Sequence, residues 1–443
     1  MVNRVSIIGL GKLGSPMAAV FASKGFSVVG VDKDPRKVEA VNRGVPPVYE
    51  TQLAELLQIH GHSIRATTDA VEAVLDTQAT FVVVPTPSEP DGQFSLQYVL
   101  QACNDIAVAL RQKGEWHLVV ITSTISPGSM DTAIRPFLEG RSGKRSGVDF
   151  GLCYSPEFIA LGSVIRDFLN PDFVLIGESD ERSGQVLECI YRQVCENDPP
   201  IVRMNFINAE LTKLAVNTFV TTKISFANML ARICEKLPEA DVDVVTRALG
   251  LDSRIGAKYL KGAVSYGGPC FPRDNLALIA TARKVGAPAD IAEATDRFNR
   301  RQVHWLADLV KSHVPLDGVV GILGLTYKPN TDVVEEAFGL LLAQELKRRA
   351  VKVVVYDPVG MENARRILGD GVMLAHSAQA CIEAADVVVV ATPWKEFASI
   401  PEGVWQRHSP PRVVFDCWRV IEHFQSWNGI TYVPLGKGGA QGC

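Results

Sequence analysis

One of the nine cysteines lies in a segment whose residue types could carry out chemistry. The segment reads Ser265-Tyr266-Gly267-Gly268-Pro269-Cys270-Phe271-Pro272-Arg273-Asp274. Paired glycines let a ligand approach the backbone, and Pro272 suits the first turn of a helix. Cys270 would then lie at the helix N-terminus, where the dipole favours the thiolate, and Asp274 could face the same cavity. A thiolate there could attack an aldehyde; the alternative for a free cysteine is a small buried core residue.

A glycine-rich turn near the N-terminus indicates a dinucleotide site. The run Gly9-Leu10-Gly11-Lys12-Leu13-Gly14 follows an apolar strand and precedes a helical stretch. Gly9 permits a tight turn, Gly11 lets the backbone approach a pyrophosphate, and Gly14 lets helix and strand pack closely. The helix N-terminus then presents its backbone N–H groups to the phosphates. The alternative is a glycine turn that binds no ligand.

An acidic residue after the second strand favours NAD as the dinucleotide. Asp32 lies where a carboxylate can bind both ribose hydroxyls and repel a 2′-phosphate. Lys33 and Lys37 are close in sequence and leave NADP open. A nicotinamide beside Cys270 would allow an aldehyde to be oxidised through a thioester.

Other polar residues could act on the same substrate. Lys213 and Asn217 have i, i+4 spacing on a predicted helix, so they share one face and could hold a hydroxyl or an oxyanion. The alternative is a solvated polar stripe. Glu157 follows a strand end, where a catalytic carboxylate could lie.

The elements that must position these residues follow an alternating pattern typical of parallel βαβ units. The first half contains buried strands at Val5–Gly9, Ser27–Val31, Thr80–Val84, Leu118–Ser123 and Phe173–Ile176. Residues 205–236 contain no proline or glycine and predict one long helix that ends before Pro238. Such a helix typically bridges domains or packs against a second subunit. A further helical stretch continues to about residue 301.

A second alternating region begins at Pro315 and predicts five more strands and two helices. These strands are Gly318–Leu325, Lys352–Asp357, Asp386–Thr392, Arg412–Asp416 and Ile430–Val433, and the helices are Phe338–Arg349 and Met361–Leu368. The predicted fold class is α/β, with two Rossmann-like, doubly wound parallel-sheet domains joined by a long central helix and a helical middle domain. The predicted domains are 1–200, 201–301 and 315–436, and the C-terminal residues Gly436–Cys443 are expected to be frayed.

The second region has a glycine turn of its own, Gly321-Ile322-Leu323-Gly324, but it lacks the third glycine and an acidic residue at the right distance. We therefore expect it to bind a different phosphorylated ligand, with Lys328 near the strand end, instead of a second dinucleotide.

The composition excludes several classes of protein. The 443 residues carry 45 Lys and Arg against 49 Asp and Glu, a net charge of −4 without a basic arm, which argues against nucleic acid as a partner. Apolar runs are far shorter than a membrane span, and no signal peptide precedes the first strand. The cysteines have no CxxC pairs, which argues against a metal site and favours reduced thiols in the cytoplasm.

Taken together, the motifs resemble the UDP-glucose/GDP-mannose dehydrogenase family over nearly the whole chain. The matching segments keep the family order: the glycine turn, Val84-Pro85-Thr86-Pro87, Ser123-Thr124, Ser155-Pro156-Glu157-Phe158, Glu210-Leu211-Thr212-Lys213-Leu214-Ala215-Val216-Asn217, Arg254-Ile255-Gly256, Gly267 to Asp274, and Gly324 to Asp332. The resemblance implies an NAD-dependent enzyme that oxidises the 6-hydroxymethyl group of a nucleotide sugar twice, to a carboxylate, with UDP-glucose as the expected substrate.

The resemblance also implies catalytic roles. Lys213, with Asn217, would assist proton removal from the alcohol and stabilise the oxyanion. Cys270 would form a thiohemiacetal and then a thioester, and Asp274 would orient or activate water. Glu157 would be the general acid/base. Thr124 would lie near both the nicotinamide and that water.

Binding roles follow from the same resemblance. For the cofactor they fall on Gly9, Gly11, Lys12, Leu13, Gly14, Asp32, Lys37, Thr86, Pro87 and Thr124. For the sugar nucleotide they fall on Glu157, Phe158, Lys213, Asn217, Arg254, Tyr259, Tyr266, Gly267, Lys328 and Arg419. The arginine that Arg254 matches reaches the substrate of the neighbouring subunit in this family. We therefore expect a homodimer or a larger homo-oligomer built on the long helix.

Three positions depart from the family pattern. Leu161 stands where a second glutamate is usual, Glu335-Glu336-Ala337 replaces Arg-Glu-Ser, and Asp416-Cys417-Trp418-Arg419 replaces Asp-Gly-Arg. Alternative functions are the same chemistry on a UDP-N-acetylhexosamine or GDP-mannose, a two-electron β-hydroxyacid dehydrogenase, and a non-catalytic paralogue that binds NAD and nucleotide sugar.

Overall fold

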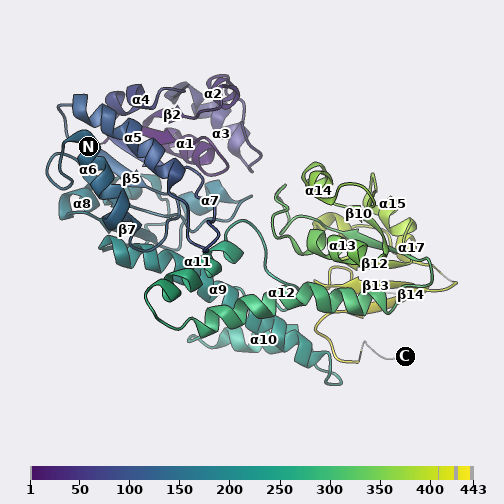
Figure 1. Ribbon diagram of the computed structural model, residues 1–443. Helices are drawn as coiled ribbons and strands as arrows, with labels where there is room; N and C mark the ends of the chain where they lie inside the picture. The colour runs from purple at the N-terminus through teal and green to yellow at the C-terminus, as the bar shows by residue number, and fades with distance from the viewer. Residues whose placement is uncertain (1, 408, 424–427, 440–443) are drawn as a thin grey trace. The chain divides into compact units, whose positions relative to one another are not determined.

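The computed structural model describes residues 2–407, 409–423 and 428–439, and it divides into two compact units, residues 1–215 and 216–443 (Figure 1). Each unit contains one β-sheet. The second unit holds most of the helical stretch, from residue 216 onward, together with the C-terminal sheet; the sequence prediction treated these as separate domains. Within the part of the chain that is described, no helix is long and apolar enough to cross a membrane.

The first unit is built on an eight-stranded sheet in the order β3-β2-β1-β4-β5-β6-β7-β8. The strands are β1 (Arg4–Ile8), β2 (Ser27–Val31), β3 (Ile64–Thr67), β4 (Ala79–Val82), β5 (Leu118–Ile121), β6 (Gly151–Tyr154), β7 (Val174–Glu178) and β8 (Ile201–Met204). The order of the first six is that of a dinucleotide-binding fold. The all-parallel expectation fails at one place, because β7 pairs with β6 in the antiparallel direction and β8 then pairs in parallel with β7.

Helices cover both faces of this sheet, which explains why its strands are mainly apolar. One face packs against α1 (Gly14–Ser23), α3 (Leu53–His60), α7 (Val164–Leu169) and α8 (Glu181–Val194). The other packs against α4 (Ala70–Asp76), α5 (Gln97–Gln112), the π-helical turn Met130–Ile134 and α6 (Arg135–Ser142). Two short elements, α2 (Pro35–Asn42) and a 3-10 turn at Gly61–Ser63, complete the unit.

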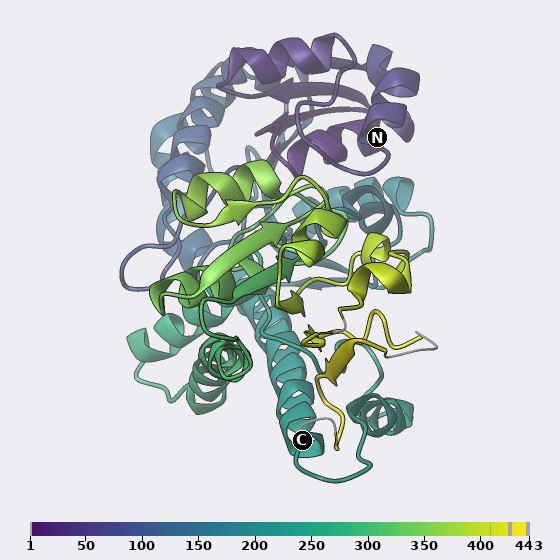
Figure 2. The same cartoon turned by 90° about the vertical axis from the view of Figure 1, so that its right-hand side faces the viewer.

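The predicted long helix is α9, which runs without interruption from Phe206 to Cys234 and appears as one teal helix in Figure 2. Three helices follow it in the second unit: α10 (Val242–Leu251), α11 (Phe271–Lys284) and α12 (Asp290–Lys311). Asp241 caps α10 by accepting a hydrogen bond from the Asp243 N–H, and Pro272 lies in the first turn of α11, as its fixed φ angle favours.

The sheet of the second unit has six parallel strands in the order β11-β10-β9-β12-β13-β14. They are β9 (Val319–Leu323), β10 (Lys352–Tyr356), β11 (Met373–Leu374), β12 (Val387–Val390), β13 (Arg412–Asp416) and β14 (Ile430–Pro434). The helices are α13 (Phe338–Arg348), α14 (Met361–Leu368), α15 (Ala378–Glu383), α16 (Lys395–Ala398) and α17 (Glu402–Trp405). The fold class predicted from the sequence is confirmed.

The glycine turn of this second sheet is more complete than the sequence suggested. Gly324 has a φ angle of 97°, and a Cβ atom on Gly339 would lie 1.9 Å from the Gly324 carbonyl oxygen. Gly339 thus takes the place of the third glycine, and a longer segment separates it from Gly324 than separates Gly14 from Gly9. Asp357, directly after β10, accepts a hydrogen bond from the Leu325 N–H at 2.8 Å and so takes the place of the missing acidic residue.

Candidate active site

The glycine turn after β1 has the geometry that a dinucleotide requires. Gly9 has a φ angle of 107°, and a Cβ atom there would lie 2.2 Å from the Val83 carbonyl oxygen. A Cβ atom on Gly14 would lie 1.8 Å from the Gly9 carbonyl oxygen, so helix α1 can pack on β1 only with glycine here. Beside Gly11 there is open space within 4 Å. The turn is therefore closed toward the protein and open where a pyrophosphate would approach.

Asp32 is held in place at the end of β2. Its carboxylate accepts hydrogen bonds from the backbone N–H groups of Leu10 and Asp34, both at 2.9 Å. Lys37 donates to the same carboxylate at 3.1 Å. Lys37 and Asp32, which were both predicted to bind the cofactor, are therefore paired with each other. The Asp32 carboxylate is held at the end of β2, where the ribose of a dinucleotide would bind.

The loops after β4 and β5 are joined by hydroxyl groups. Thr86 donates to the Thr124 carbonyl oxygen at 2.7 Å, and the Ser123 hydroxyl accepts from the Val84 N–H at 2.9 Å. Glu210, a fully buried residue of α9, accepts from the N–H groups of Gly128 and Met130 at 2.6 and 2.7 Å. Burial raises the pKa of Glu210 to about 7, against the effect of these hydrogen bonds. Glu210 thus ties α9 to the loop that carries Thr124.

Three of the predicted residues meet in the first unit. The Lys213 amine donates to the backbone carbonyl oxygen of Glu157 at 2.6 Å and lies over the Phe158 ring, 4.7 Å from its centre. Tyr191 of α8 donates to the Glu157 carboxylate at 3.0 Å. Burial raises the pKa of Glu157 to about 7, although the Tyr191 hydrogen bond and the Lys213 charge both lower it. A carboxyl group with this pKa can give and take protons near neutral pH.

Cys270 occupies the predicted position in the second unit. It is exposed and forms the N-cap of α11, whose Asp274 N–H donates to the Cys270 carbonyl oxygen at 2.8 Å. The buried Asp274 carboxylate accepts from the Asn217 amide at 2.5 Å. The structure therefore brings Asn217 of α9 to the first turn of α11. That turn follows Cys270 directly in the sequence.

The segment before Cys270 packs against the loop after β9. A Cβ atom on Gly267 would lie 2.0 Å from the Glu336 carbonyl oxygen, and one on Gly268 would lie 2.7 Å from the Tyr327 ring. The Gly268 N–H donates to the Glu335 carbonyl oxygen at 3.0 Å. The paired glycines therefore serve a close contact between two chain segments, and the same loop carries Lys328 beside Tyr327.

Three domain models of one family match the chain. They are the NAD binding domain, the central domain and the UDP binding domain of the UDP-glucose/GDP-mannose dehydrogenase family, over residues 3–195, 207–301 and 321–423. The chain belongs to this family. Its resemblance to the family, predicted from the motifs, is thereby confirmed, as is NAD as the cofactor.

Individual relatives agree with the domain models. The chain is 39% identical over 435 residues to UDP-glucose 6-dehydrogenase AglM of Haloferax volcanii, a match that covers 97% of this chain and 99% of the relative. It is 35% identical to GDP-mannose 6-dehydrogenase of Azotobacter vinelandii, over 80% of this chain and 81% of the relative. The structure of a UDP-glucose dehydrogenase from Pyrobaculum islandicum has a TM-score of 0.89 and 36% identity, and the match covers 99% of this chain and 98% of the other. The protein is therefore an NAD-dependent dehydrogenase of the nucleotide-sugar 6-dehydrogenase family.

Arg419, which the resemblance assigned to the substrate, makes its contacts inside the second unit. Arg419 is 1% exposed at its side chain, and its guanidinium donates to Asp243 and to the carbonyl oxygens of Gly262 and Leu435. It is a buried contact inside the second unit, in the turn after β13. Arg254, in contrast, is exposed and pairs with Asp252 at 2.6 Å. Tyr259 is half exposed and has a φ angle of 65°.

The other departures from the family pattern have simple structural descriptions. The side chains of Glu335 and Glu336 are exposed, and the contact to Gly268 is made by the Glu335 backbone. Leu161 is partly exposed in the loop before α7. Neither residue disturbs the contacts among Asn217, Asp274 and the α11 N-terminus.

Several residues of the site could not be found from spacing along the chain. Tyr191 lies on α8, far in sequence from Glu157, and only the fold brings the two together. Glu210 was part of a recognised motif, but its contact with the Thr124 loop was not predicted. Asn228 and Asn299 both bind the backbone of the segment before Cys270. The signal available in the sequence was a polar residue on an otherwise apolar face of a helix. Such a residue indicates a hydrogen bond, because buried polar groups are hydrogen-bonded.

Proposed function

We propose that the protein oxidises the C6 hydroxymethyl group of UDP-glucose to a carboxylate, with two NAD⁺ consumed and UDP-glucuronate released. The observation that carries this proposal is the arrangement at α11: an exposed Cys270 at the helix N-terminus, with the Asn217 amide bound to Asp274 one turn further on. A cysteine in this setting favours the thiolate, which is the nucleophile needed for the second oxidation.

In the first oxidation the alcohol loses its O–H proton and a hydride from C6. Lys213 and Asn217 have i, i+4 spacing on α9, so their polar ends lie on one face and can hold the alcohol oxygen as it becomes an alkoxide. NAD⁺, when bound, supplies the hydride acceptor for this oxidation and for the second one. The product of the first oxidation is an aldehyde that stays bound.

In the second oxidation the Cys270 sulfur adds to the aldehyde carbon to give a thiohemiacetal. Loss of a hydride from that carbon and of the hydroxyl proton leaves a thioester. Water then adds to the thioester carbon, the C–S bond breaks, and the carboxylate and the thiol are released. Asp274 orients this water, and Glu157, whose pKa is near 7, takes its proton. Thr124 lies on the loop that Glu210 holds and serves the same water and the nicotinamide.

The identity of the substrate rests on the degree of similarity. The UDP-glucose dehydrogenases reach 39% sequence identity over 97% of this chain and a TM-score of 0.89. The GDP-mannose dehydrogenases reach 35% identity over 80% of this chain and a TM-score of 0.55. The alternative substrates are a UDP-N-acetylhexosamine and GDP-mannose, and the remote alternative is a non-catalytic paralogue. Lys328, Tyr259, Tyr266 and Gly267 are the proposed contacts of the nucleotide sugar in the second unit. The product would serve polysaccharide biosynthesis, and the free cysteines fit a cytoplasmic enzyme.

We also propose that the active form is at least a homodimer. Four large apolar residues of α9, namely Phe219, Phe226, Met229 and Ile233, are exposed at helical spacing, and Phe219 is 66% exposed. A stripe of this kind fits a second copy of the same helix, because exposed apolar side chains that lie side by side mark interfaces between proteins. The exposed Arg254 would then contact the substrate of the partner subunit.

The test of the proposed function is a panel of limiting sugar nucleotides. UDP-glucose, UDP-N-acetylglucosamine, UDP-N-acetylmannosamine and GDP-mannose are each added below the concentration of NAD⁺, and the absorbance of NADH is followed to its end. We expect about two NADH per UDP-glucose and far slower turnover of the others. If another sugar nucleotide is oxidised faster, it would replace UDP-glucose as the proposed substrate. Binding of NAD⁺ without formation of NADH from any of the four would favour the non-catalytic paralogue.

A further inference from the structure

The seven residues Gly262 to Gly268 form the segment that leads to Cys270, and we call this segment the cysteine loop. Side chains from outside the loop hold much of its backbone. Asn228 of α9 accepts from the Ala263 N–H at 2.8 Å and donates to the Val264 carbonyl oxygen at 2.7 Å. Asn299 of α12 binds the N–H and the carbonyl oxygen of Tyr266 in the same way, at 2.9 and 3.0 Å. The conformation of the loop therefore depends on the elements around it.

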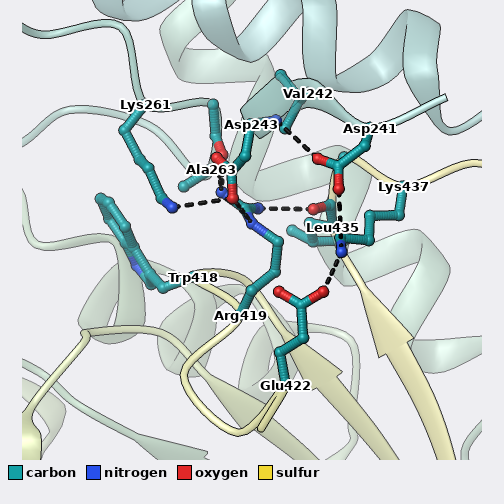
Figure 3. Close-up of polar contacts among 12 residues, drawn as sticks. Asp241, Val242, Asp243, Lys261, Ala263, Trp418, Arg419, Glu422, Leu435 and Lys437 are labelled. Carbon is teal, nitrogen blue, oxygen red and sulfur yellow. Dashed lines mark hydrogen bonds and ion pairs between the residues drawn. The ribbon is translucent and has the colours of Figure 1, made fainter. Parts of the chain in front are cut away.

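The first residue of the cysteine loop is held from the C-terminal sheet. Arg419 donates to the Gly262 carbonyl oxygen at 2.8 Å and to the Leu435 carbonyl oxygen at 2.7 Å, and it binds both carboxylate oxygens of Asp243 at 2.7 and 3.0 Å (Figure 3). Burial by itself raises the pKa of Asp243, but the hydrogen bonds and charges of Arg419 and Lys261 lower it overall, which favours the carboxylate form of Asp243. One guanidinium thus joins the cysteine loop, the first turn of α10 and the residue after β14.

The turn after β13 is built to present Arg419 in this position. The buried Asp416 carboxylate accepts from the N–H groups of Trp418 and Ile421 at 3.2 and 2.9 Å. The Trp418 indole donates to the Ala391 carbonyl oxygen at 2.9 Å. Arg419 itself has a φ angle of 59°, in the left-handed region that non-glycine residues rarely adopt. An outlier of this kind persists only where surrounding contacts hold it, and here they are made by Asp416, by Trp418 and by the Arg419 guanidinium.

We propose that Arg419 is a positioning residue for the reaction: it fixes the start of the cysteine loop and thereby the place of Cys270 at the N-terminus of α11. The last residue of the cysteine loop also binds the C-terminal α/β fold: the Gly268 N–H donates to the Glu335 carbonyl oxygen, in the loop after β9, at 3.0 Å. The loop is therefore attached at both ends to the C-terminal α/β fold. This proposal deepens the proposed function, because it rests on Cys270 being the nucleophile.

The structure offers a matched control for this proposal. Lys437 also lies where the end of the C-terminal sheet meets the start of α10, and we call this region the junction. It pairs with Asp241 at 3.0 Å and with Glu422 (Figure 3). Both of these partners lie outside the cysteine loop. Lys437→Met should therefore weaken the contacts between the end of the sheet and α10 and leave the loop in place.

The experiment compares Arg419→Met, Arg419→Lys and Lys437→Met with the wild-type protein. Hydrogen–deuterium exchange is measured for the peptide that contains residues 263–268, and kcat and the KM for NAD⁺ are measured with UDP-glucose. In Arg419→Met we expect the loop amides to exchange at least tenfold faster and kcat to fall at least tenfold, with the KM for NAD⁺ within twofold of wild type. Lysine can pair with Asp243 but cannot reach both carbonyl oxygens, so Arg419→Lys should be intermediate. Lys437→Met should resemble wild type in all three measurements.

Two results would overturn the proposal. One is equal loop exchange and equal kcat in Arg419→Met and Lys437→Met, which would reduce Arg419 to a contact of the junction. The other is wild-type loop exchange and kcat in Arg419→Lys, if Arg419→Met does not fold. Because amide exchange needs no turnover, it reports on the loop even if the wild-type protein oxidises no sugar nucleotide. In that case the proposed function fails, and the exchange data still decide whether Arg419 holds the loop.

Discussion

The substitution Tyr191→Phe tests the proposed role of Glu157, because it removes one hydroxyl group that contacts the carboxylate. The hydroxyl donates to Glu157 at 3.0 Å, and burial keeps the pKa of Tyr191 well above its ordinary value, so the hydroxyl is a neutral donor at all working pH values. A hydrogen bond to a charged group contributes about 1.5–3 kcal/mol. At about 1.4 kcal/mol per pKa unit, its loss should raise the pKa of Glu157 by about one to two units.

The sign of the effect follows from the role of Glu157 as a base. The pKa of Glu157 is about 7 in the native protein and should rise to about 8–9 in Tyr191→Phe. The acidic limb of the kcat profile should move to higher pH by the same amount, so that at pH 7.5 the active, ionised fraction falls by about three- to twenty-five-fold. Above pH 10 the two proteins should have similar rates.

The assay is the pH dependence of kcat with saturating UDP-glucose and NAD⁺. The matched control is Ser155→Ala, which removes the other partner of the Tyr191 hydroxyl, 2.9 Å away, and leaves the contact to Glu157 in place. Its profile should stay within about half a unit of wild type. An acidic limb that does not move in Tyr191→Phe would refute the assignment of Glu157 as the group that titrates.

Three further predictions address the cofactor, the loop and the oligomer. Asp32→Asn should raise the KM for NAD⁺ about tenfold or more, since the ribose hydroxyls lose a charged acceptor. Asp34→Asn, at a residue that caps α2 and pairs with Arg36, is its control in steady-state kinetics and should change the KM little. Glu210→Gln should lower kcat about tenfold, because Gly128 and Met130 donate to different carboxylate oxygens and an NH2 group would replace one of these acceptors. Glu139→Gln, whose carboxylate accepts from the Ser146 N–H away from the site, should not lower it. Phe219→Ser should shift the protein toward monomer in light scattering after size exclusion, and Leu316→Ser, at a 98% exposed residue, should not. Equal effects in a variant and its control would contradict the corresponding assignment.

Much of the fold could be predicted because buried parallel strands are continuous apolar runs. Arg412–Asp416 and Ser27–Val31 have the predicted bounds, and α9 lies within the predicted range. The antiparallel direction of β7 could not be predicted, since a short apolar run carries no sign of its direction. The C-terminal end was also misjudged: Gly436 accepts from the Val242 N–H and donates to Glu235, although residues 440–443 lie outside the described part of the chain.

The candidate site divides in the same way. Residues adjacent to a glycine turn or to a helix start, such as Asp32 and Cys270, could be assigned a position because the local backbone decides where they lie. Contacts over long sequence separations could not: Tyr191 with Glu157, Glu210 with Gly128, and Arg419 with Gly262. Gly339 is a similar case, because the longer segment after Gly324 hides the third glycine of a turn that the fold completes.

The most direct test of the central claim is a search for the acyl group on Cys270. The variant Asp274→Asn should slow the proposed attack of water on the thioester. It is mixed with UDP-glucose and excess NAD⁺, quenched in acid and digested. The mass of the peptide that contains Cys270 is then measured by mass spectrometry. We predict a mass increase that corresponds to a uronyl thioester of the sugar nucleotide, which hydroxylamine removes, and its absence in Asp274→Asn combined with Cys270→Ser. Formation of two NADH per UDP-glucose by Cys270→Ser alone, with no adduct in any variant, would contradict the thioester mechanism.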